Sequence, residues 1–417
     1  MSIFIGSLPN NNEDDRLLAK EIVKDENFSK GSLKKLGSYF QNEYSRHEIF
    51  LFNKGREGLF TILKSINIES GDEVLVQPFT CIAVVAPILW VKAKPVYVDI
   101  ELGTFNIDLE KLKESITDST RAIILQHTFG NLVDVSKARE IVKEINSKRN
   151  KDRKIVIIED CAHFYTTQFK VGQYSDFLLF SFAQDKALSC TQGAMIAIPK
   201  NSIYLSKFNT LYKEVRELST KEAKYNARYI ILWSLIKKYY YSINIPFLHF
   251  SLGKLLLMIF RISNLIKKQA SIISLNPEEA FKMSDIQATL LLAQIDRIES
   301  LNEHREHITE LYLQGLKEEF RFQTNNHSLL RYPLLIGNRD QIKKELKREK
   351  IIIGSWYTTP VFPLLESQLQ LAGYVKGSCP IAEHCCKNII NLPTNIEVTD
   401  EMARKIIWII NSKAIKI

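Results

Sequence analysis

Short apolar runs of strand length alternate with longer segments of helical length between residues 50 and 200. Several of these runs are apolar at almost every position, which is typical of strands that other elements cover on both faces. Strands that alternate with helices in this way predict an α/β domain with a mostly parallel sheet. We predict strands at 73–78, 95–100, 122–126, 155–159, 177–182 and 194–199, and helices that include 109–116 and 134–148.

The alternation stops where a basic and aromatic segment spans residues 202–275. Beyond this segment a long helix is predicted from Ser284, whose hydroxyl suits an N-cap. A smaller α+β domain at the C-terminus is indicated by predicted strands at 331–336 and 351–356 and a closing helix at 400–411. We therefore predict a large domain over 1–275, with the inserted segment inside it, and a small domain over 276–417.

The composition is that of a folded intracellular protein. A chain of 417 residues with 45% hydrophobic content can bury a sizeable core and form two domains. The six cysteines form no Cys-x-x-Cys pair, which argues against both a disulfide framework and a zinc ribbon. The first residues lack the basic start of a signal peptide, so we expect a cytoplasmic protein. The sequence also lacks the nucleotide-binding motifs GxxxxGK[ST] and GxGxxG and the metalloprotease motif HExxH.

The positive charge of the chain is concentrated in one segment. The formal net charge is +9, and no Asp or Glu occurs between Ala223 and Pro277. We consider two roles for residues 230–268: peripheral contact with the inner face of an anionic membrane, or an arm packed on a partner subunit. The uncharged run 239–253 contains a proline and is shorter than the roughly 20 residues of a spanning helix. Because no nucleic-acid module accompanies the charge, no nucleic-acid partner is expected. The basic residues of the segment are Lys224, Arg228, Lys237, Lys238, Lys254, Arg261, Lys267 and Lys268.

Two predicted strands end beside side chains that suit a single cofactor. Asp160 follows the apolar run 155–158, and Lys186 lies five residues after Ser181. Ligands of parallel sheets bind beyond the carboxyl ends of the strands, so these side chains should meet at one edge. Pyridoxal 5'-phosphate needs a lysine amine for a covalent link to its aldehyde and a carboxylate that keeps its ring nitrogen protonated. The pairing therefore predicts a pyridoxal-phosphate enzyme.

Seven short motifs occur in a fixed order along most of the chain. They are Gly-Arg-Glu-Gly-Leu at 55–59, Ser-Gly-Asp-Glu-Val-Leu-Val-Gln-Pro at 70–78, Lys-Pro-Val-Tyr-Val-Asp at 94–99, Glu-Asp-Cys-Ala-His at 159–163, Ser-Phe-Ala-Gln-Asp-Lys at 181–186, Met-Ser-Asp-Ile-Gln at 283–287 and Asn-Leu-Pro-Thr at 391–394. This ordered set resembles the DegT/StrS-type sugar aminotransferases, a branch of the fold-type-I pyridoxal-phosphate enzymes. One motif alone would be weak support, but chance matches would not keep order and spacing.

The resemblance implies an activity and a set of site residues. It implies a homodimer with a shared active site, glutamate as the amino donor and a nucleotide-linked keto-sugar as the acceptor, in polysaccharide or glycoconjugate biosynthesis. It makes Lys186 and Asp160 catalytic. Ser181 and the turn at Gly55 are implied to bind the cofactor phosphate, and His163 to reach the phenolic oxygen of the ring. The full implied cofactor set is Gly55, Arg56, Glu57, Cys81, Asp160, His163, Ser181 and Lys186.

Several positions depart from the pattern of that family, among them residues 191–194, which read Thr-Gln-Gly-Ala where the family has Gly-Glu-Gly-Gly. Arg56 stands where the family usually has Thr, and its guanidinium could grip phosphate instead. Cys81 replaces the aromatic residue that stacks on the cofactor ring, and Ala280 replaces an asparagine that a neighbouring subunit offers to the phosphate. Two alternatives therefore stay open: another pyridoxal-phosphate reaction, such as that of a lyase or dehydratase, and a cofactor-bound sensor or scaffold without turnover. Related dehydratases have histidine in place of the lysine, so Lys186 favours amino transfer.

Other histidines are predicted to be structural. His304 and His307 are spaced i, i+3 and could be imagined as a metal pair, but a solvated helix face is the simpler interpretation because no third ligand is in view. His127 ends a predicted strand and is assigned to packing. The same holds for His384 and the two cysteines after it, so we predict no metal site.

Overall fold

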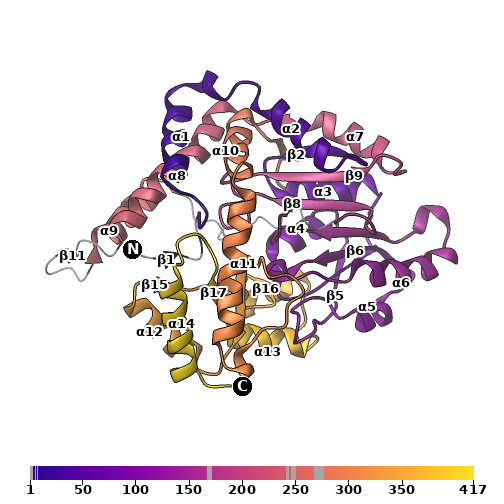
Figure 1. Cartoon of the computed structure of the whole chain (residues 1–417). Helices are drawn as coiled ribbons and strands as arrows, with labels where there is room; N and C mark the ends of the chain where they lie inside the picture. Colours follow the sequence, from indigo (N-terminus) through magenta and orange to yellow (C-terminus); the bar gives the residue numbers. More distant parts are fainter. Residues whose placement is uncertain are drawn as a thin grey trace.

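The computed structural model of the chain describes residues 3–4, 6, 8–166, 171–240, 244–245, 250–266 and 277–417. A large sheet has helices on both faces, and the last third of the chain forms most of a second group of helices and short strands (Figure 1). This architecture confirms the predicted α/β fold with a mostly parallel sheet. The helices of the N-terminal two thirds are α1 (Glu13–Lys24), α2 (Ser32–Glu43), α3 (Gly55–Ser65), α4 (Ile82–Trp90), α5 (Leu109–Ser115), α6 (Val135–Ser147), α7 (Leu205–Glu214), α8 (Thr220–Tyr239) and α9 (Leu252–Ile262).

Nine of the described strands form the large sheet, in the order β10-β13-β2-β9-β8-β7-β6-β3-β5. The five strands from β8 to β5 are mutually parallel, and β9 runs antiparallel to both of its neighbours. All six predicted strands are present, with ends that differ by up to three residues. The strand bounds are β2 (His47–Phe52), β3 (Glu73–Val76), β5 (Lys94–Tyr97), β6 (Thr120–Gln126), β7 (Val156–Asp160), β8 (Phe177–Ser181), β9 (Ala194–Pro199), β10 (Arg216–Glu217) and β13 (Phe281–Lys282).

Both faces of the sheet are covered because successive side chains of a strand point to opposite sides. Along β6, Ile123 packs into the core under α5 and α6, whereas Ile124 packs into the core under α3 and α7. Along β8, Leu178 packs with α1, α2, α8 and α10, and Leu179 packs with α3 and α7. Two-sided burial explains why these strands are apolar throughout, and it leaves their carboxyl ends as the place for polar chemistry.

The C-terminal third packs around α11, the long helix in the middle of Figure 1. Its core also takes in Phe79, Phe105 and Phe129, which lie in segments that follow strands of the large sheet. The loops beyond the strand ends are thus fixed against the C-terminal group. The remaining elements are α10 (Asp285–Ile295), α11 (Ile298–Gly315), α12 (Arg339–Arg348), α13 (Pro380–Asn388), α14 (Asp400–Lys413), β1 (Ile3–Phe4), β4 (Thr80–Cys81), β14 (Arg331–Leu335), β15 (Ile351–Ile352), β16 (Val361–Phe362) and β17 (Ile389–Pro393).

The helix predicted from Ser284 begins where expected and then breaks. Ser284 is the N-cap of α10, and its hydroxyl accepts the N–H of Gln287 (3.4 Å). The helix ends at Ile295, and α11 starts at Ile298. α10 packs against α2, so it belongs in space with the helices over the large sheet.

The inserted segment contains a helical hairpin. α8 and α9 pack against each other, and α9 reaches away from the sheet at the left edge of Figure 1. The short strands β11 (Asn244–Ile245) and β12 (Phe250–Ser251) lie between the two helices. Residues 241–243, 246–249 and 267–276 lie outside the described residues, so the predictions for Lys267 and Lys268 do too. Within the described chain, no helix is both long enough and apolar enough to cross a membrane.

Candidate active site

A cavity of about 290 Å³ opens beyond the carboxyl ends of β6, β7 and β8. Its walls come from these strand ends, from the start of α3 and from the segment after β15. Seven of the eight predicted cofactor residues line it: Gly55, Arg56, Cys81, Asp160, His163, Ser181 and Lys186. Among the other lining residues are Lys54, Gln126, Ala162, Asp185, Trp356 and Tyr357.

Asp160 is the last residue of β7 and is buried. Its Oδ1 atom accepts the N–H of Ala162 at 2.9 Å. Burial raises the pKa of the Asp160 carboxyl, whereas that hydrogen bond and the charge of Lys186 act in the opposite direction. A cationic partner in the cavity would therefore favour the ionised carboxylate.

Lys186 lies in the loop after β8, on a turn in which its N–H bonds to the carbonyl of Ala183 (3.2 Å). Its Nζ atom is 5.2 Å from the centre of the Trp356 ring, which is a cation–π distance. On the other side of the loop, the side-chain amide of Asn10 donates to the carbonyl of Lys186 (3.1 Å). The loop backbone is thus held in place while the amine faces the cavity.

The start of α3 and the end of β8 face each other. A Cβ atom added to Gly55 would lie 3.8 Å from Ser181 Oγ, so the first turn of α3 and that hydroxyl border the same space. Free backbone N–H groups and the helix dipole favour an anion at a helix start. The neighbouring Arg56 adds a positive charge at this end of the cavity.

The two cations at this end share one carboxylate within the chain. Glu278 Oε2 lies 3.0 Å from Arg56 Nε and 3.2 Å from Lys54 Nζ. Glu278 precedes β13, which pairs with β2, so it enters the site from the segment before α10. An internal anion thus pairs with Arg56, which the sequence analysis assigned to the phosphate, and with Lys54, which it did not.

Glu57 is buried but does not line the cavity. Its carboxylate accepts the backbone N–H groups of Lys54 (3.1 Å) and Phe281 (3.3 Å). It also lies 3.3 Å from Lys54 Nζ. The side chain therefore braces the start of α3 against β13 from outside the cavity.

His163 uses both ring nitrogens within the protein. Nδ1 accepts the N–H of Phe129 (3.1 Å), so the proton of the neutral ring is on Nε2, which donates to the hydroxyl of Tyr357 (3.0 Å). Burial first, and then the charges of Lys186 and Arg331, hold the pKa of His163 well below its ordinary value. His163 is therefore a neutral ring that orients the Tyr357 hydroxyl.

Three residues at the site come from the C-terminal third and were not predicted. Trp356 and Tyr357 line the cavity, and Arg331 stacks on Trp356 with its guanidinium carbon 3.4 Å from the ring centre. Arg331 is only 3% exposed, and burial lowers its pKa to about 10, so it is charged at neutral pH. The two adjacent aromatic residues at the end of the predicted strand 351–356 were the only sign of this wall in the sequence. The strand ends that they face across the cavity lie far away in the sequence.

Cys81 is the N-cap of α4, and its sulfur accepts the N–H of Ala83 (3.5 Å). Burial raises the pKa of the Cys81 thiol, which disfavours a reactive thiolate. Cys81 thus borders the cavity as a small neutral side chain, where the family pattern has a stacking aromatic ring.

The cavity fits pyridoxal phosphate in its donor chemistry. It offers an amine at Lys186 and a buried carboxylate at Asp160. At the other end, a helix start, the Ser181 hydroxyl and the Arg56 guanidinium suit a phosphate group. A volume of about 290 Å³ is close to the lower end of small-molecule pockets, roughly 300 Å³.

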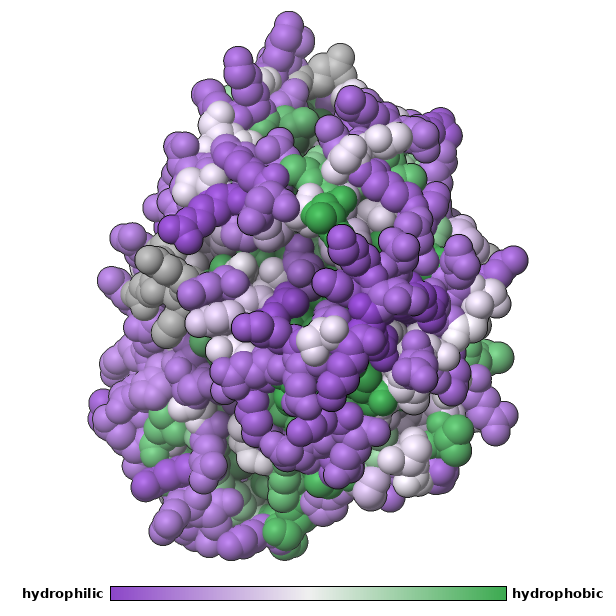
Figure 2. Space-filling view, turned by 90° about the vertical axis from the view of Figure 1, so that its right-hand side faces the viewer, coloured by the Kyte–Doolittle hydropathy of each residue, from purple (hydrophilic) through white to green (hydrophobic). Residues whose placement is uncertain are grey.

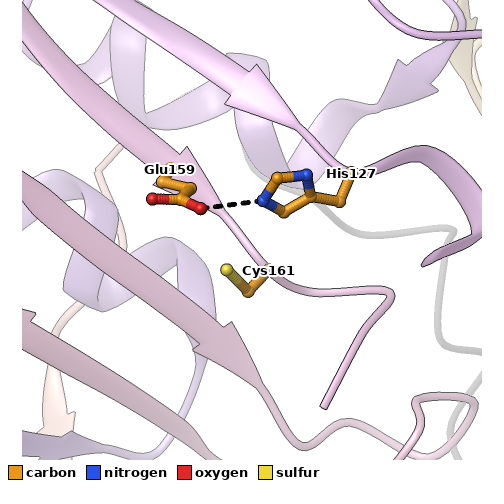
Figure 3. A group of neighbouring side chains, drawn as sticks. All are labelled: His127, Glu159 and Cys161. Atoms are coloured by element: carbon orange, nitrogen blue, oxygen red, sulfur yellow. Dashed lines mark hydrogen bonds and ion pairs between the residues drawn. The ribbon is translucent and has the colours of Figure 1, made fainter. Parts of the chain in front are cut away.

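A second buried cluster lies close to Asp160 in the sequence but is not a metal centre. Figure 3 shows His127 pointing at Glu159, with Cys161 beside them. His127 Nδ1 accepts the N–H of Val133 (3.1 Å), so Nε2 carries the proton and donates to Glu159 (3.0 Å). The other oxygen of Glu159 accepts the hydroxyl of Ser175 (2.8 Å), and burial raises the pKa of the Cys161 thiol far above its usual range. The cluster is a satisfied hydrogen-bond network, in line with the packing role predicted for His127.

The predicted helix-face histidines have separate partners. His304 Nε2 lies 2.9 Å from the carbonyl of Asn395, and His307 Nε2 lies 2.7 Å from Asp400. His304 and His307 are absent from the metal-like clusters found among the described residues.

The family model of the DegT/DnrJ/EryC1/StrS aminotransferases matches residues 10–225 and 261–411. The chain belongs to this family. It is therefore a pyridoxal-phosphate-dependent aminotransferase, as the order of its motifs predicts. The family match omits residues 226–260, which hold the outer part of the α8–α9 hairpin.

Named relatives and solved structures agree with this assignment. GDP-perosamine synthase of Caulobacter vibrioides is 26% identical over 363 residues, which cover 84% of this chain and 81% of the relative. UDP-N-acetyl-3-dehydro-alpha-D-glucosamine 3-aminotransferase of Acidithiobacillus ferrooxidans is 22% identical over 367 residues, which cover 85% and 81%. The structure of Helicobacter pylori PseC, an aminotransferase of pseudoaminic acid biosynthesis, matches with a TM-score of 0.69 at 17% identity and covers 98% of both chains.

Proposed function

We propose that this aminotransferase moves an amino group from glutamate to a nucleotide-linked keto-sugar, in polysaccharide or glycoconjugate biosynthesis. The observation that carries the proposal is that Lys186 and Asp160 line one cavity together with the start of α3. Relatives with sugar-nucleotide names support the substrate class.

Pyridoxal phosphate, when bound, supplies an aldehyde carbon for an amine and a cationic ring that stabilises negative charge beside that carbon. In our proposal Asp160 holds the proton on the ring nitrogen. Its burial strengthens the interaction, because a carboxylate in a low-dielectric site favours a cationic partner. Gly55, Arg56 and Ser181 hold the phosphate at the opposite end of the cavity.

Lys186 is the proposed general base. Its amine would hold the cofactor covalently at the aldehyde carbon and, once free, would take a proton from the α-carbon of the donor. The Trp356 ring, with its centre 5.2 Å from Lys186 Nζ, borders the space in which the amine acts. Because donor and acceptor occupy the same cavity in turn, ping-pong kinetics are expected.

The proposed assembly is a homodimer with a shared active site. A two-fold dimer is the commonest closed symmetry for an enzyme of this size. We place the enzyme in the cytoplasm, with residues 230–268 in contact either with the inner membrane face or with the partner subunit.

A screen of nucleotide-linked keto-sugars with the cofactor-loaded enzyme and glutamate tests the reaction. We expect one or more sugars to be aminated by the wild type and none by Lys186→Ala. Glutamate alone should bleach the visible absorbance of the bound cofactor. If no amino donor bleaches it, the sensor or scaffold alternative, to which Cys81 and Ala280 point, replaces the enzyme proposal.

A further inference from the structure

Helix α9 has apolar side chains on two opposite faces. Leu256 and Phe260 face inward and pack against the core that includes α8. Met258, Ile259 and Ile262 face outward and are 50%, 46% and 77% exposed. At about 100° per residue, Met258 and Ile262 lie within 40° of each other and roughly opposite the inward pair. The inner face packs α9 against the core. The side chains of the outer face belong to none of the hydrophobic clusters found among the described residues.

The hairpin is closely packed, which makes the outer face a fixed surface. A Cβ atom on Gly253 would lie 2.5 Å from Tyr240 Cα and 2.6 Å from the carbonyl oxygen of Ile236. Only glycine permits so close a crossing of α9 over α8. Figure 1 shows α9 at the edge of the molecule, away from the large sheet.

The charge around this face has one sign. Lys254 and Arg261 lie on α9 beside the exposed apolar positions, within about 60° of Met258 on the helix surface. No acidic residue occurs between Ala223 and Pro277. This stretch carries eight basic residues and no acidic ones, so the rest of the chain is nearly neutral within the formal net charge of +9. An anionic surface would complement the single sign of charge on this face.

The side of the molecule opposite α9 does not show this pattern. Figure 2, which looks at the right-hand side of Figure 1, shows a mainly hydrophilic face with apolar side chains in small separate spots. An exposed apolar stripe bordered by basic residues marks an interaction site. Lys254, Met258 and Ile259 lie in residues 226–260, outside the ranges that match the family model, and Arg261 and Ile262 are the first residues of the second matched range.

We propose that the outer face of α9 docks this aminotransferase on an anionic lipid bilayer. The aliphatic side chains enter the boundary between head groups and acyl chains, and the basic residues bind lipid phosphates. Each basic residue near such a surface strengthens binding by about fivefold. The proposal goes beyond the amino-transfer reaction, and its failure would leave that reaction untouched.

Co-sedimentation of the full-length holoenzyme with vesicles tests the proposal. The two probes are vesicles of phosphatidylcholine alone and vesicles that also contain phosphatidylglycerol. The wild type is expected to bind the anionic vesicles and not the neutral ones, with weaker binding at high salt. The triple variant Met258→Gln, Ile259→Gln, Ile262→Gln should lose at least about tenfold in binding.

A matched control replaces exposed aliphatic residues elsewhere, with Leu102→Gln, Ile203→Gln and Val375→Gln in one protein. This control should bind vesicles as the wild type does. All three proteins should keep the wild-type mass in solution and the same amino-transfer rate without vesicles. Equal binding of the wild type to both vesicle types would overturn the proposal, and so would full binding by the α9 variant. A change of oligomeric mass in the α9 variant would instead assign the face to a subunit interface.

Discussion

At the scale of single residues, His163 shows how the fold fixes a protonation state. The family resemblance implied that this ring reaches the cofactor, yet both of its nitrogens are used, by the N–H of Phe129 and by the hydroxyl of Tyr357. The ring therefore acts through Tyr357, whose hydroxyl it orients beside the cavity. Sequence predicted the presence of a ring at this place, but the backbone N–H that sets its tautomer comes from Phe129, 34 residues away.

The depressed pKa of His163 predicts a pH-dependent loss of stability. The unfolded chain binds a proton on this ring below pH about 6.5, while the folded chain does not, so the wild type is destabilised as the pH falls from 7 to 5. His163→Gln removes this effect. In denaturant unfolding, the advantage of the wild type over the variant should shrink by up to about 2 kcal/mol between pH 7 and pH 5.

His384→Gln, which removes an exposed imidazole, is the control for that experiment and should follow the wild type. If the free energies of unfolding of the wild type and His163→Gln changed with pH in the same way, the buried ring would be protonated in the folded state, which would contradict the prediction.

Glu278 gives a second prediction at this scale. Its carboxylate holds Arg56 and Lys54, so it competes with the cofactor phosphate for the same charges. Glu278→Gln should tighten pyridoxal phosphate binding to the apoenzyme by about fivefold, which corresponds to roughly 1 kcal/mol for a partly exposed ion pair. Titration monitored by cofactor absorbance measures the effect.

Two controls separate this competition from a general change of the site. Glu279→Gln removes the neighbouring carboxylate, which pairs with Arg216 on the surface, and should leave the affinity unchanged. Pyridoxal, which lacks the phosphate, should bind the wild type and Glu278→Gln equally. Weaker phosphate-cofactor binding by Glu278→Gln would mean that Glu278 positions Arg56 for the phosphate.

At the scale of elements, the sequence predicted the sheet well because burial on both faces leaves a strong apolar signal. It predicted a helix over 284–298, whereas α10 ends at Ile295 and α11 starts at Ile298. Neither Asp296 nor Arg297 is a helix breaker, but Arg297 Nη2 donates to both carboxylate oxygens of Asp15 (2.7 and 2.9 Å), a tertiary contact with no local signal.

The predicted strand 351–356 was too long for a related reason. Only Ile351–Ile352 pair as a strand, with β1. Gly354 still forms an isolated antiparallel bridge with the backbone of Asn391. Beyond it the side chain of Asn391 takes over: its Oδ1 accepts the N–H of Trp356 (2.7 Å) and its Nδ2 donates to the carbonyl of Trp356 (3.2 Å). Such side-chain pairing turns Trp356 toward the cavity and cannot be seen in hydrophobic periodicity.

The α8–α9 hairpin supplies the prediction at this scale. Gly253→Val places side-chain atoms against the backbone of Tyr240, which should push α9 off α8 at a cost of about 1–3 kcal/mol. Limited proteolysis should then cut the hairpin faster, while amino transfer is kept because α9 is remote from the cavity. Gly377→Val is a suitable control, since nothing lies within 4 Å of a Cβ atom there. Its positive φ adds local strain without opening the hairpin. Unchanged cleavage of Gly253→Val would contradict the close crossing.

At the scale of the whole molecule, the candidate site joins three regions that are distant in sequence. The strand ends and the start of α3 carry the residues that motif order could predict. The wall formed by Trp356 and Tyr357, with Arg331 behind it, comes from the C-terminal third and depends on tertiary packing. The proposed catalytic pair is thus predictable from local sequence, whereas the shape of the other side of the cavity is a property of the folded chain.

The central claim is that Lys186 carries the cofactor, and borohydride reduction of the holoenzyme tests it most directly. Reduction makes the bond between cofactor and lysine permanent, so digestion and mass spectrometry locate it. The cavity contains two lysines, Lys54 and Lys186, which makes the experiment discriminating. The account predicts a pyridoxyl group on Lys186 in the wild type and none in Lys186→Ala. A label on Lys54, or no label in a protein that has bound the cofactor, would contradict it.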